Sequence, residues 1–307
     1  MAINKAVLKT IKAVSFAHID VKNKYQKISH LYRLAHPFIS DISEGYIFAD
    51  SEINDIPIRT FIPDVSESED ILIFFHGGGW VIGDIESYSH TCSVMCRETK
   101  RCVIAVEYRK APENKFPDGL YDCYQVVKKI AEDKKENQRI ILIGDSAGGN
   151  LSAAVCLMAR EKKEFEIDAQ ILIYPAVFND HSENSPFKSV HECGKDYFLT
   201  AQRVCDYAEM YAKSPEDYNN PLFAPLLAEN HENLPPALIL TAEYDPLRDE
   251  GEAYGEKLRS AGNYAEIHRI EDALHGFITL PLNFKIVQQS YNYINEFLDK
   301  AAYNNGI

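Results

Sequence analysis

The sequence has no long hydrophobic run and no excess of basic residues. No apolar stretch approaches the ~20 residues that a helix needs to cross a bilayer, and the opening segment, MAINKAVLKTIKAVSFAHIDVKNK, mixes Lys, His and Asp with apolar residues. Lys and Arg number 32 against 46 Asp and Glu, a net charge of -14 with His neutral, and this sign repels nucleic-acid phosphates. We therefore expect a soluble, unprocessed cytoplasmic protein with no membrane insertion and no nucleic-acid partner.

The sequence also lacks a recognisable cysteine framework. Its seven cysteines form an odd set, and no two of them make a C-x-x-C pair, so neither a set of disulfides nor a zinc site is indicated. We interpret them as reduced thiols that serve as small apolar residues, and we expect no metal site.

Short apolar runs rich in β-branched residues alternate with longer helical or polar stretches. Runs such as ILIFF, RIILIG and AQILIY lack polar alternation, which is typical of strands buried on both faces of a mostly parallel sheet. The first two runs are joined by the polar stretch SEIND and are better read as an antiparallel hairpin at the sheet edge. The sequence thus predicts an α/β fold, with a mostly parallel eight-stranded sheet flanked by helices. The expected strands are Tyr46 to Ala49, Ile56 to Ile62, Ile71 to Phe75, Cys102 to Val106, Ile140 to Ile143, Gln170 to Ile173, Ala237 to Thr241 and Ala265 to Ile270.

Two segments do not fit this alternation of strand and helix. Residues 1 to about 42 are amphipathic, and residues about 176 to 228 are rich in Tyr, Asn and Pro. Open α/β sheets bind ligands beyond the carboxyl ends of their strands, where an insertion after a strand would lie. We expect both segments to form a helical cap on a single domain, 1–307, with Tyr197, Tyr207, Tyr211 and Tyr218 as cap packing residues.

The strongest local signal is the pentapeptide Gly144-Asp-Ser146-Ala-Gly148. It follows an apolar run directly and leads into a helix of small residues, Leu151 to Arg160. This context predicts a nucleophile elbow, in which a sharp strand-to-helix turn presents the serine hydroxyl at the helix N-terminus and leaves almost no room for side chains at the two glycines. The alternative is a tight turn with an inert serine.

A second signal, His76-Gly77-Gly78-Gly79-Trp80, follows the expected strand ILIFF. Three consecutive glycines cost backbone entropy and bury nothing, so we expect their bare backbone to be used. In acyl transfer, backbone N–H groups stabilise the oxyanion of the transition state, and we assign this role to Gly78, Gly79 and Ala147. A phosphate-binding loop is the competing reading, but HGGGW matches neither G-x-x-x-x-G-K-[ST] nor G-x-G-x-x-G.

A serine hydroxyl needs a base, and that base needs an orienting carboxylate. Around a nucleophile elbow the chain order is Ser, acid, His. The run ALILTAEYD places Asp245 just past a late strand, which makes it the expected acid. Asp249 and Asp272 are rivals, although Asp249 is expected in the helix that DPLRDEG opens and Asp272 can simply cap the following loop.

The expected base is His275, which comes after the last strand in a loop ending Leu-His-Gly-Phe. His181, His191 and His231 also follow the serine in or near loops, whereas His268 lies within an expected strand. The position of His275 beyond the final strand favours it over the others.

Five motifs, in their order and spacing, resemble the hormone-sensitive-lipase-type (bacterial family IV) esterases of the α/β-hydrolase fold. They are HGGGW, Tyr108-Arg-Lys-Ala-Pro-Glu113, GDSAGGN, EYDPLRDEG and HGF, and the resemblance covers about residues 70 to 280. At matching positions it implies that Ser146 is the nucleophile, His275 the general base and acid, and Asp245 the acid that orients His275. It also implies that Gly78, Gly79 and Ala147 are the oxyanion donors.

The resemblance further implies a carboxylic ester hydrolase without metal or cofactor, with a cap built from the N-terminal helices and residues 176–228, and often a homodimer. It gives His76, with Gly77, a role in bracing the oxyanion loop. We place Trp80 and Asp145 in the substrate pocket.

These observations predict a serine carboxylesterase that hydrolyses small, short-chain esters through an acyl-enzyme. An amidase, peptidase or lactonase would use the same machinery, so the sequence leaves these activities open. A non-catalytic small-molecule receptor on this fold is a further alternative, but such a receptor would usually have lost the serine or the histidine.

Overall fold

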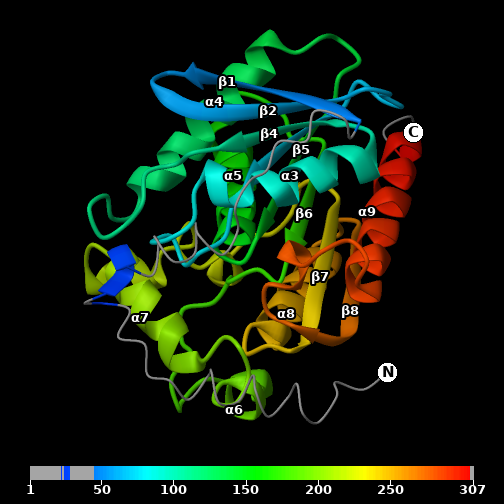
Figure 1. Cartoon of the computed structure of the whole chain (residues 1–307). Helices are drawn as coiled ribbons and strands as arrows, with labels where there is room; N and C mark the ends of the chain where they lie inside the picture. The colour runs from blue at the N-terminus through cyan, green and yellow to red at the C-terminus, as the bar shows by residue number, and fades with distance from the viewer. Residues whose placement is uncertain (1–21, 23, 28–44, 305–307) are drawn as a thin grey trace.

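The computed structural model describes residues 22, 24–27 and 45–304. Eight strands form one sheet in the order β1-β2-β4-β3-β5-β6-β7-β8 (Figure 1). Each expected strand is present, so the predicted α/β architecture is confirmed. The bounds are β1 (Tyr46–Ile53), β2 (Ile56–Pro63), β3 (Ile71–Phe75), β4 (Cys102–Val106), β5 (Ile140–Asp145), β6 (Ala169–Ile173), β7 (Ala237–Tyr244) and β8 (Ala265–Leu274).

The first two strands form the antiparallel hairpin that the sequence predicts. They pair from Tyr46 opposite Pro63 to Ile53 opposite Ile56, and the two residues between them, Asn54 and Asp55, have φ of 52° and 63°. Asn and Asp tolerate this left-handed region better than most residues, which suits a two-residue hairpin turn. β2 also pairs antiparallel with β4, and every other pair in the sheet is parallel.

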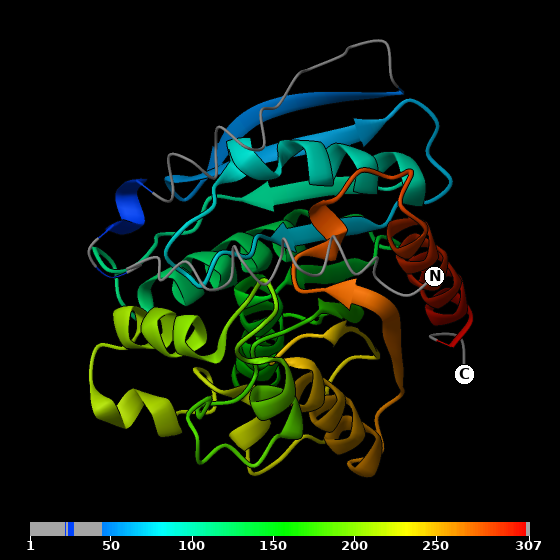
Figure 2. The same ribbon diagram turned by 60° about the horizontal axis from the view of Figure 1, so that its bottom comes forward.

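Helices cover both faces of the sheet (Figures 1 and 2). Successive side chains of a strand point to opposite faces, so Leu72 and Phe74 of β3 pack in one core and Ile73 and Phe75 in the other. The first core is shared with α3 (Ile85–Thr99) and α9 (Lys285–Asn304), and the second with α4 (Asp118–Asp133), α5 (Ala147–Lys162) and α8 (Arg248–Ser260). Burial on both faces accounts for the unbroken apolar runs of the central strands.

The segment predicted to form a cap lies between β6 and β7. It contains α6 (Lys188–Cys193), α7 (Ala201–Tyr211), η1 (Pro215–Asn219) and η2 (Pro225–Leu227), and Figure 1 shows α6 and α7 outside the sheet. The buried amide of Asn150 in α5 donates to the carbonyls of Ala176 and Phe223, both at 2.8 Å. These two hydrogen bonds fix both ends of the segment to the helix that follows Ser146.

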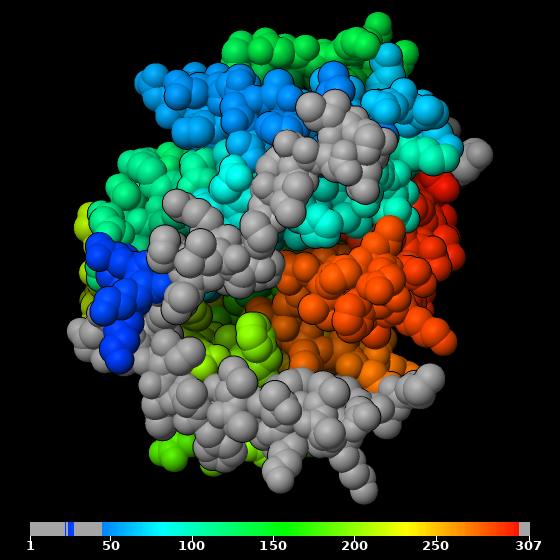
Figure 3. Space-filling view, viewed as in Figure 1, coloured from blue at the N-terminus to red at the C-terminus, as the bar shows by residue number. Residues whose placement is uncertain are grey.

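A short helical piece near the N-terminus contacts the same segment and also the loop between β4 and α4. Lys22 forms ion pairs with Asp206 and Glu209 of α7, and the Tyr25 hydroxyl donates to Glu113 at 2.6 Å. Figure 3 shows this piece, in blue, on the surface. The rest of the predicted N-terminal cap segment, 1–42, lies outside the described residues.

A buried ion network joins the residues that directly precede three neighbouring central strands, β3, β4 and β5. Asp70 accepts two hydrogen bonds from Arg139, at 2.9 and 2.5 Å, and one from Arg101 at 3.2 Å. Burial alone would raise the pKa of Asp70, but the hydrogen bonds, chiefly from Arg139, hold it below its ordinary value. The carboxylate is therefore charged and compensated at neutral pH.

We expect Asp70→Ala to lower the free energy of unfolding by about 3–5 kcal/mol. It removes the carboxylate that pairs with Arg139 and leaves the buried Arg101 only its ion pair with Asp299 at 3.3 Å. Glu69→Ala is the matched control. Its ion pair with Lys135 is exposed on both sides, so it should cost at most about 1 kcal/mol. Urea unfolding of the two variants measures the difference, and equal losses would contradict the prediction.

Candidate active site

The Gly-x-Ser-x-Gly segment forms a sharp turn between β5 and α5. Ser146 has φ 54° and ψ -118°, a strained conformation of the kind a nucleophile elbow requires. A Cβ on Gly144 would lie 2.3 Å from the carbonyl oxygen of Gly148, and a Cβ on Gly148 would lie 1.9 Å from that of Phe75. Backbone atoms cannot move away from such contacts, so only glycine fits at either position.

Ser146, His275 and Asp245 come together at this turn although they are far apart in the sequence. His275 Nε2 lies 2.9 Å from Ser146 Oγ, and His275 Nδ1 lies 2.7 Å from Asp245 Oδ2. Asp245 is fully buried after β7 and also accepts a hydrogen bond from the backbone N–H of Leu247 at 2.9 Å. Ser146 and His275 are both partly exposed.

The rival carboxylates lie elsewhere. Asp249 is in the first turn of α8, where it pairs with Arg248 and accepts from the backbone N–H of Ser189. Asp272 falls within β8, and its backbone N–H donates to Glu243 at 2.7 Å.

The other candidate histidines also have different partners. His181 Nε2 lies 2.5 Å from Glu250, and His191 and His231 each contact a backbone carbonyl oxygen. His268 stacks on Tyr293 from within β8. Of the sequence candidates, the structure brings His275 to the serine.

The glycine-rich loop follows β3 and lies against the turn at Ser146. Gly78 and Gly79 have φ of 111° and 61°, and both are partly exposed. Ala147 is the first residue of α5, so its N–H has no carbonyl partner within the helix. The loop is folded back on itself by hydrogen bonds from the N–H groups of Val81 and Ile82 to the carbonyl of Gly78.

His76 lies at the base of this loop and is buried. Its Nδ1 lies 2.7 Å from the carbonyl oxygen of Gly77, and its ring stacks on Tyr108 with centroids 4.4 Å apart. Burial first, and then the positive charge of Lys110, lower the pKa of His76 to about 4. The imidazole is therefore neutral at physiological pH and donates from Nδ1 to the loop carbonyl, which fits a bracing role.

Asp145, the residue before the serine, is bonded to the same loop. It is 2% exposed, and its carboxylate accepts from the backbone N–H of Gly77 at 2.7 Å and from the hydroxyls of Tyr88 and Tyr174 at 3.1 and 3.3 Å. The ring of Tyr174 also lies 4.6 Å from that of His275. Asp145 thus joins the turn at Ser146 to the glycine loop, and its place in the substrate pocket stays a prediction.

Burial raises the pKa of Asp145 from 3.8 to about 6. The folded state thus binds the proton of the Asp145 carboxyl more tightly than the unfolded state does. The contribution of Asp145 to the free energy of unfolding is therefore largest below about pH 4 and is lost as the pH rises through about 6. Asp145→Asn has no such titration. We expect the unfolding free energy of Asp145→Asn to improve relative to wild type by up to about 3 kcal/mol between pH 4 and pH 7. Urea unfolding of both proteins across this range checks it, and a difference that does not change with pH would contradict it.

Trp80 ends the glycine loop and is also largely buried. Its ring stacks on Tyr211 with centroids 4.6 Å apart and planes at 2°, and it contacts Phe223 at 6.1 Å. Its role in the substrate pocket stays a prediction, whereas its packing links the loop to α7.

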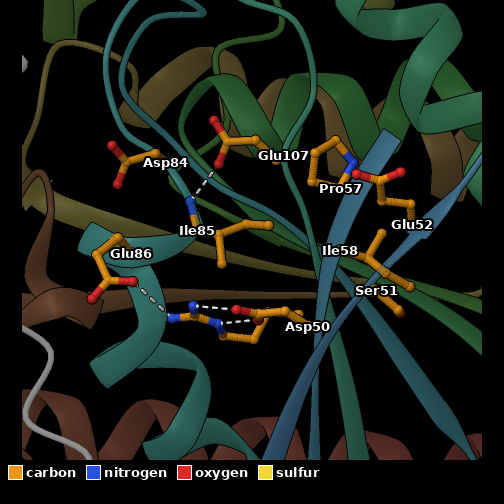
Figure 4. Close-up of a pocket in the computed structure, with 10 residues that line it drawn as sticks. Asp50, Ser51, Glu52, Pro57, Ile58, Asp84, Ile85, Glu86 and Glu107 are labelled. Atoms are coloured by element: carbon orange, nitrogen blue, oxygen red, sulfur yellow. Dashed lines mark hydrogen bonds and ion pairs between the residues drawn. The ribbon is translucent and has the colours of Figure 1, made fainter. Parts of the chain in front are cut away.

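A separate hollow of about 530 Å³ lies between the β1–β2 hairpin and the start of α3 (Figure 4). Among the residues that line it, Arg59 donates hydrogen bonds to Asp50 and Glu86. The backbone N–H of Ile85 donates to Glu107 at 2.6 Å. None of the predicted site residues lines it. Its charged walls are unlike the mostly apolar pockets that bind small neutral ligands, so we do not assign the ester site here.

No group of three or more His, Cys, Asp or Glu side chains among the described residues is placed to hold a metal ion. In the same part of the chain, no helix combines the length and apolar character needed to span a membrane. All seven cysteines are free thiols.

Known proteins are similar to this chain in sequence and in fold. Residues 72–279 match a family described by the α/β-hydrolase fold. An arylesterase of Saccharolobus solfataricus is 38% identical over 232 residues, which is 74% of each chain. Esterase LipI of Mycobacterium tuberculosis is 32% identical over 290 residues, covering 90% of this chain and 88% of its own. An esterase structure from Pyrobaculum calidifontis has a TM-score of 0.85 at 30% identity, over 95% of this chain and 98% of that one.

These similarities define the class first: the protein is a hydrolase of the α/β-hydrolase fold. Within that class, the chain belongs to the hormone-sensitive-lipase-type family, as its motifs predict, and the predicted enzyme class, carboxylic ester hydrolase, is confirmed.

Proposed function

We propose that the chain is a serine carboxylesterase in which Ser146 attacks the ester, His275 transfers the proton and Asp245 orients the imidazole. The observation that carries this proposal is the hydrogen-bonded series from Ser146 Oγ through His275 to Asp245, with distances of 2.9 and 2.7 Å. It is supported by the strained backbone of Ser146, which presents its hydroxyl at the start of α5.

In the proposed acylation step, Ser146 Oγ bonds to the carbonyl carbon and its proton moves to His275 Nε2. The carboxylate of Asp245 accepts a hydrogen bond from His275 Nδ1, so Nε2 is left free to accept that proton. The tetrahedral intermediate then expels the alcohol, which takes the proton from Nε2. Water repeats the sequence on the acyl-enzyme and releases the carboxylic acid.

We assign the oxyanion to the backbone N–H groups of Gly78, Gly79 and Ala147. Preorganised donors of this kind are each worth about 3 kcal/mol in the transition state. Two contacts support the assignment: Gly77 is fixed to Asp145 beside the nucleophile, and Gly148 packs against the carbonyl of Phe75 at the base of the loop. Both hold the glycine loop next to Ser146.

We propose short-chain esters as substrates, with residues 176–228 acting as a cap that bounds the acyl group. Contacts from α7 to the glycine loop, through Tyr211 and Trp80, support this arrangement. The arylesterase relative also favours aryl esters such as p-nitrophenyl acetate as convenient probes.

The test is hydrolysis of p-nitrophenyl esters from acetate to palmitate, with and without a chelator. We expect kcat/KM to be highest for acyl groups from acetyl to hexanoyl and to be unchanged by the chelator. A peak at palmitate would contradict the short-chain proposal, and loss of activity in chelator would contradict the metal-free mechanism. An amidase or lactonase would instead cleave matched anilides or lactones faster than these esters.

A further inference from the structure

Helix α7 presents two tyrosines, Tyr207 and Tyr211, to consecutive residues of the glycine loop. Residues four positions apart lie on one face of a helix. Tyr211 stacks on Trp80, while the ring of Tyr207 lies over Gly79. A Cβ on Gly79 would come within 2.4 Å of Tyr207 Cγ and within 2.7 Å of both Cδ atoms.

The two tyrosines differ in their surroundings. Tyr211 is almost completely buried and packs among other aromatic rings, whereas Tyr207 remains partly exposed. Burial of much of its ring raises the pKa of Tyr207 to about 12, so the phenol is neutral at physiological pH. Tyr207 thus presents an uncharged aromatic surface beside Gly79, which is itself partly exposed.

This surface lies next to the reacting atoms of the proposed mechanism. The N–H of Gly79 is one of the assigned oxyanion donors, so the ester carbonyl would bind within hydrogen-bond distance of it. A substituent that branches at the carbon next to the carbonyl needs space close to the same residue. The ring of Tyr207 occupies space on the side of Gly79 where a side chain would point.

We propose that Tyr207 is a specificity-determining residue that restricts substrates to esters of acids unbranched at the carbon next to the carbonyl. This inference rests on the proposed ester hydrolysis at Ser146. It assigns to one cap tyrosine a role that the others do not share, since Tyr218 packs on Phe223 with centroids 5.2 Å apart.

The test compares kcat/KM for the p-nitrophenyl esters of acetic, 2-methylpropanoic and 2,2-dimethylpropanoic acids. We expect wild type to favour acetate strongly over the 2,2-dimethylpropanoate. Tyr207→Ala should lower the ratio of kcat/KM for acetate to that for the 2,2-dimethylpropanoate by about 10-fold or more. This is the size of the discrimination that a pocket achieves between substrates differing by one or two methyl groups. Tyr207→Phe keeps the ring and should keep the preference of wild type.

Tyr218→Ala is the matched control, because it removes another cap tyrosine without opening space over Gly79. An equal change of preference in Tyr218→Ala would mean general loosening of the cap and would overturn the proposal. So would an unchanged preference in Tyr207→Ala, or a wild type that hydrolyses all three esters equally well. If Tyr207→Ala does not fold, Tyr207→Leu retains apolar packing with a smaller side chain and should shift the preference in the same direction.

Failure of the proposed function gives a different result. If ester hydrolysis persisted in Ser146→Ala, the proposed reaction at Ser146 would be wrong, whatever the preference for acyl groups. If instead activity depends on Ser146 while the preference ignores Tyr207, the proposed function stands and the specificity role alone is wrong.

Discussion

Ser146→Ala is expected to lower kcat for p-nitrophenyl acetate by about 10⁴- to 10⁶-fold, because it removes the atom that forms the acyl-enzyme in the proposed mechanism. The residual rate would come from binding and from the oxyanion donors alone. Fold and stability should change little, since Ser146 Oγ makes its hydrogen bond to the partly exposed His275. Single-turnover and steady-state measurements on the purified variant give the loss directly.

Ser152→Ala is the matched control, because it makes the same substitution six residues further along the chain, within α5. The Ser152 hydroxyl is buried and donates to the carbonyl of Gly148 at 2.9 Å, so the variant should lose stability of about 1 kcal/mol and retain kcat within about 10-fold. Substantial activity in Ser146→Ala, free of contaminating esterase, would mean that another residue is the nucleophile.

The parts of the molecule that the sequence predicts well are those fixed by local sterics and burial. Central strands such as β5 are apolar without alternation because helices cover both faces. The glycines on either side of Ser146 are required by backbone atoms within a few residues or on the adjacent strand. Such constraints leave a continuous pattern in the chain, so the fold and the sharp turn at Ser146 can be predicted without coordinates.

The supporting contacts of the site depend on tertiary packing and leave no such pattern. Asp145 is held by Gly77, Tyr88 and Tyr174, which come from three different segments. No local signal marks either tyrosine. The motif GDSAGGN includes Asn150, but its hydrogen bonds to Ala176 and Phe223 became evident only from the folded chain.

The cap segment shows the same limit. Sequence alone does not distinguish the cap tyrosines from one another, so it predicts that Tyr207 is a packing residue like the others. Only its position over Gly79 distinguishes it.

Glu250 is a second residue whose surroundings the sequence does not reveal. It follows Asp249 in an acidic helix start, yet it is fully buried, accepts hydrogen bonds from the N–H groups of Val177 and Phe178, and contacts His181. From its position in the sequence alone, Glu250 would be expected to be exposed.

Asp245→Asn is expected to lower kcat by about 10⁴-fold while leaving the fold intact. The carboxylate accepts from His275 Nδ1 in the proposed mechanism, at a distance of 2.7 Å. An amide nitrogen facing Nδ1 would instead favour the tautomer with its proton on Nε2, which then cannot accept the proton of Ser146. The loss therefore reflects a misplaced proton, and KM should change much less than kcat.

Asp249→Asn separates this role from a general effect of removing an acidic residue near the site. Asp249 is paired with Arg248 and accepts from Ser189, so its loss should affect stability, with kcat remaining within about 10-fold of wild type. Thermal unfolding monitored by circular dichroism checks that both variants are folded at the assay temperature. If Asp249→Asn showed the 10⁴-fold loss and Asp245→Asn did not, the orienting carboxylate would be Asp249, and the hydrogen bond from His275 to Asp245 would have no catalytic role.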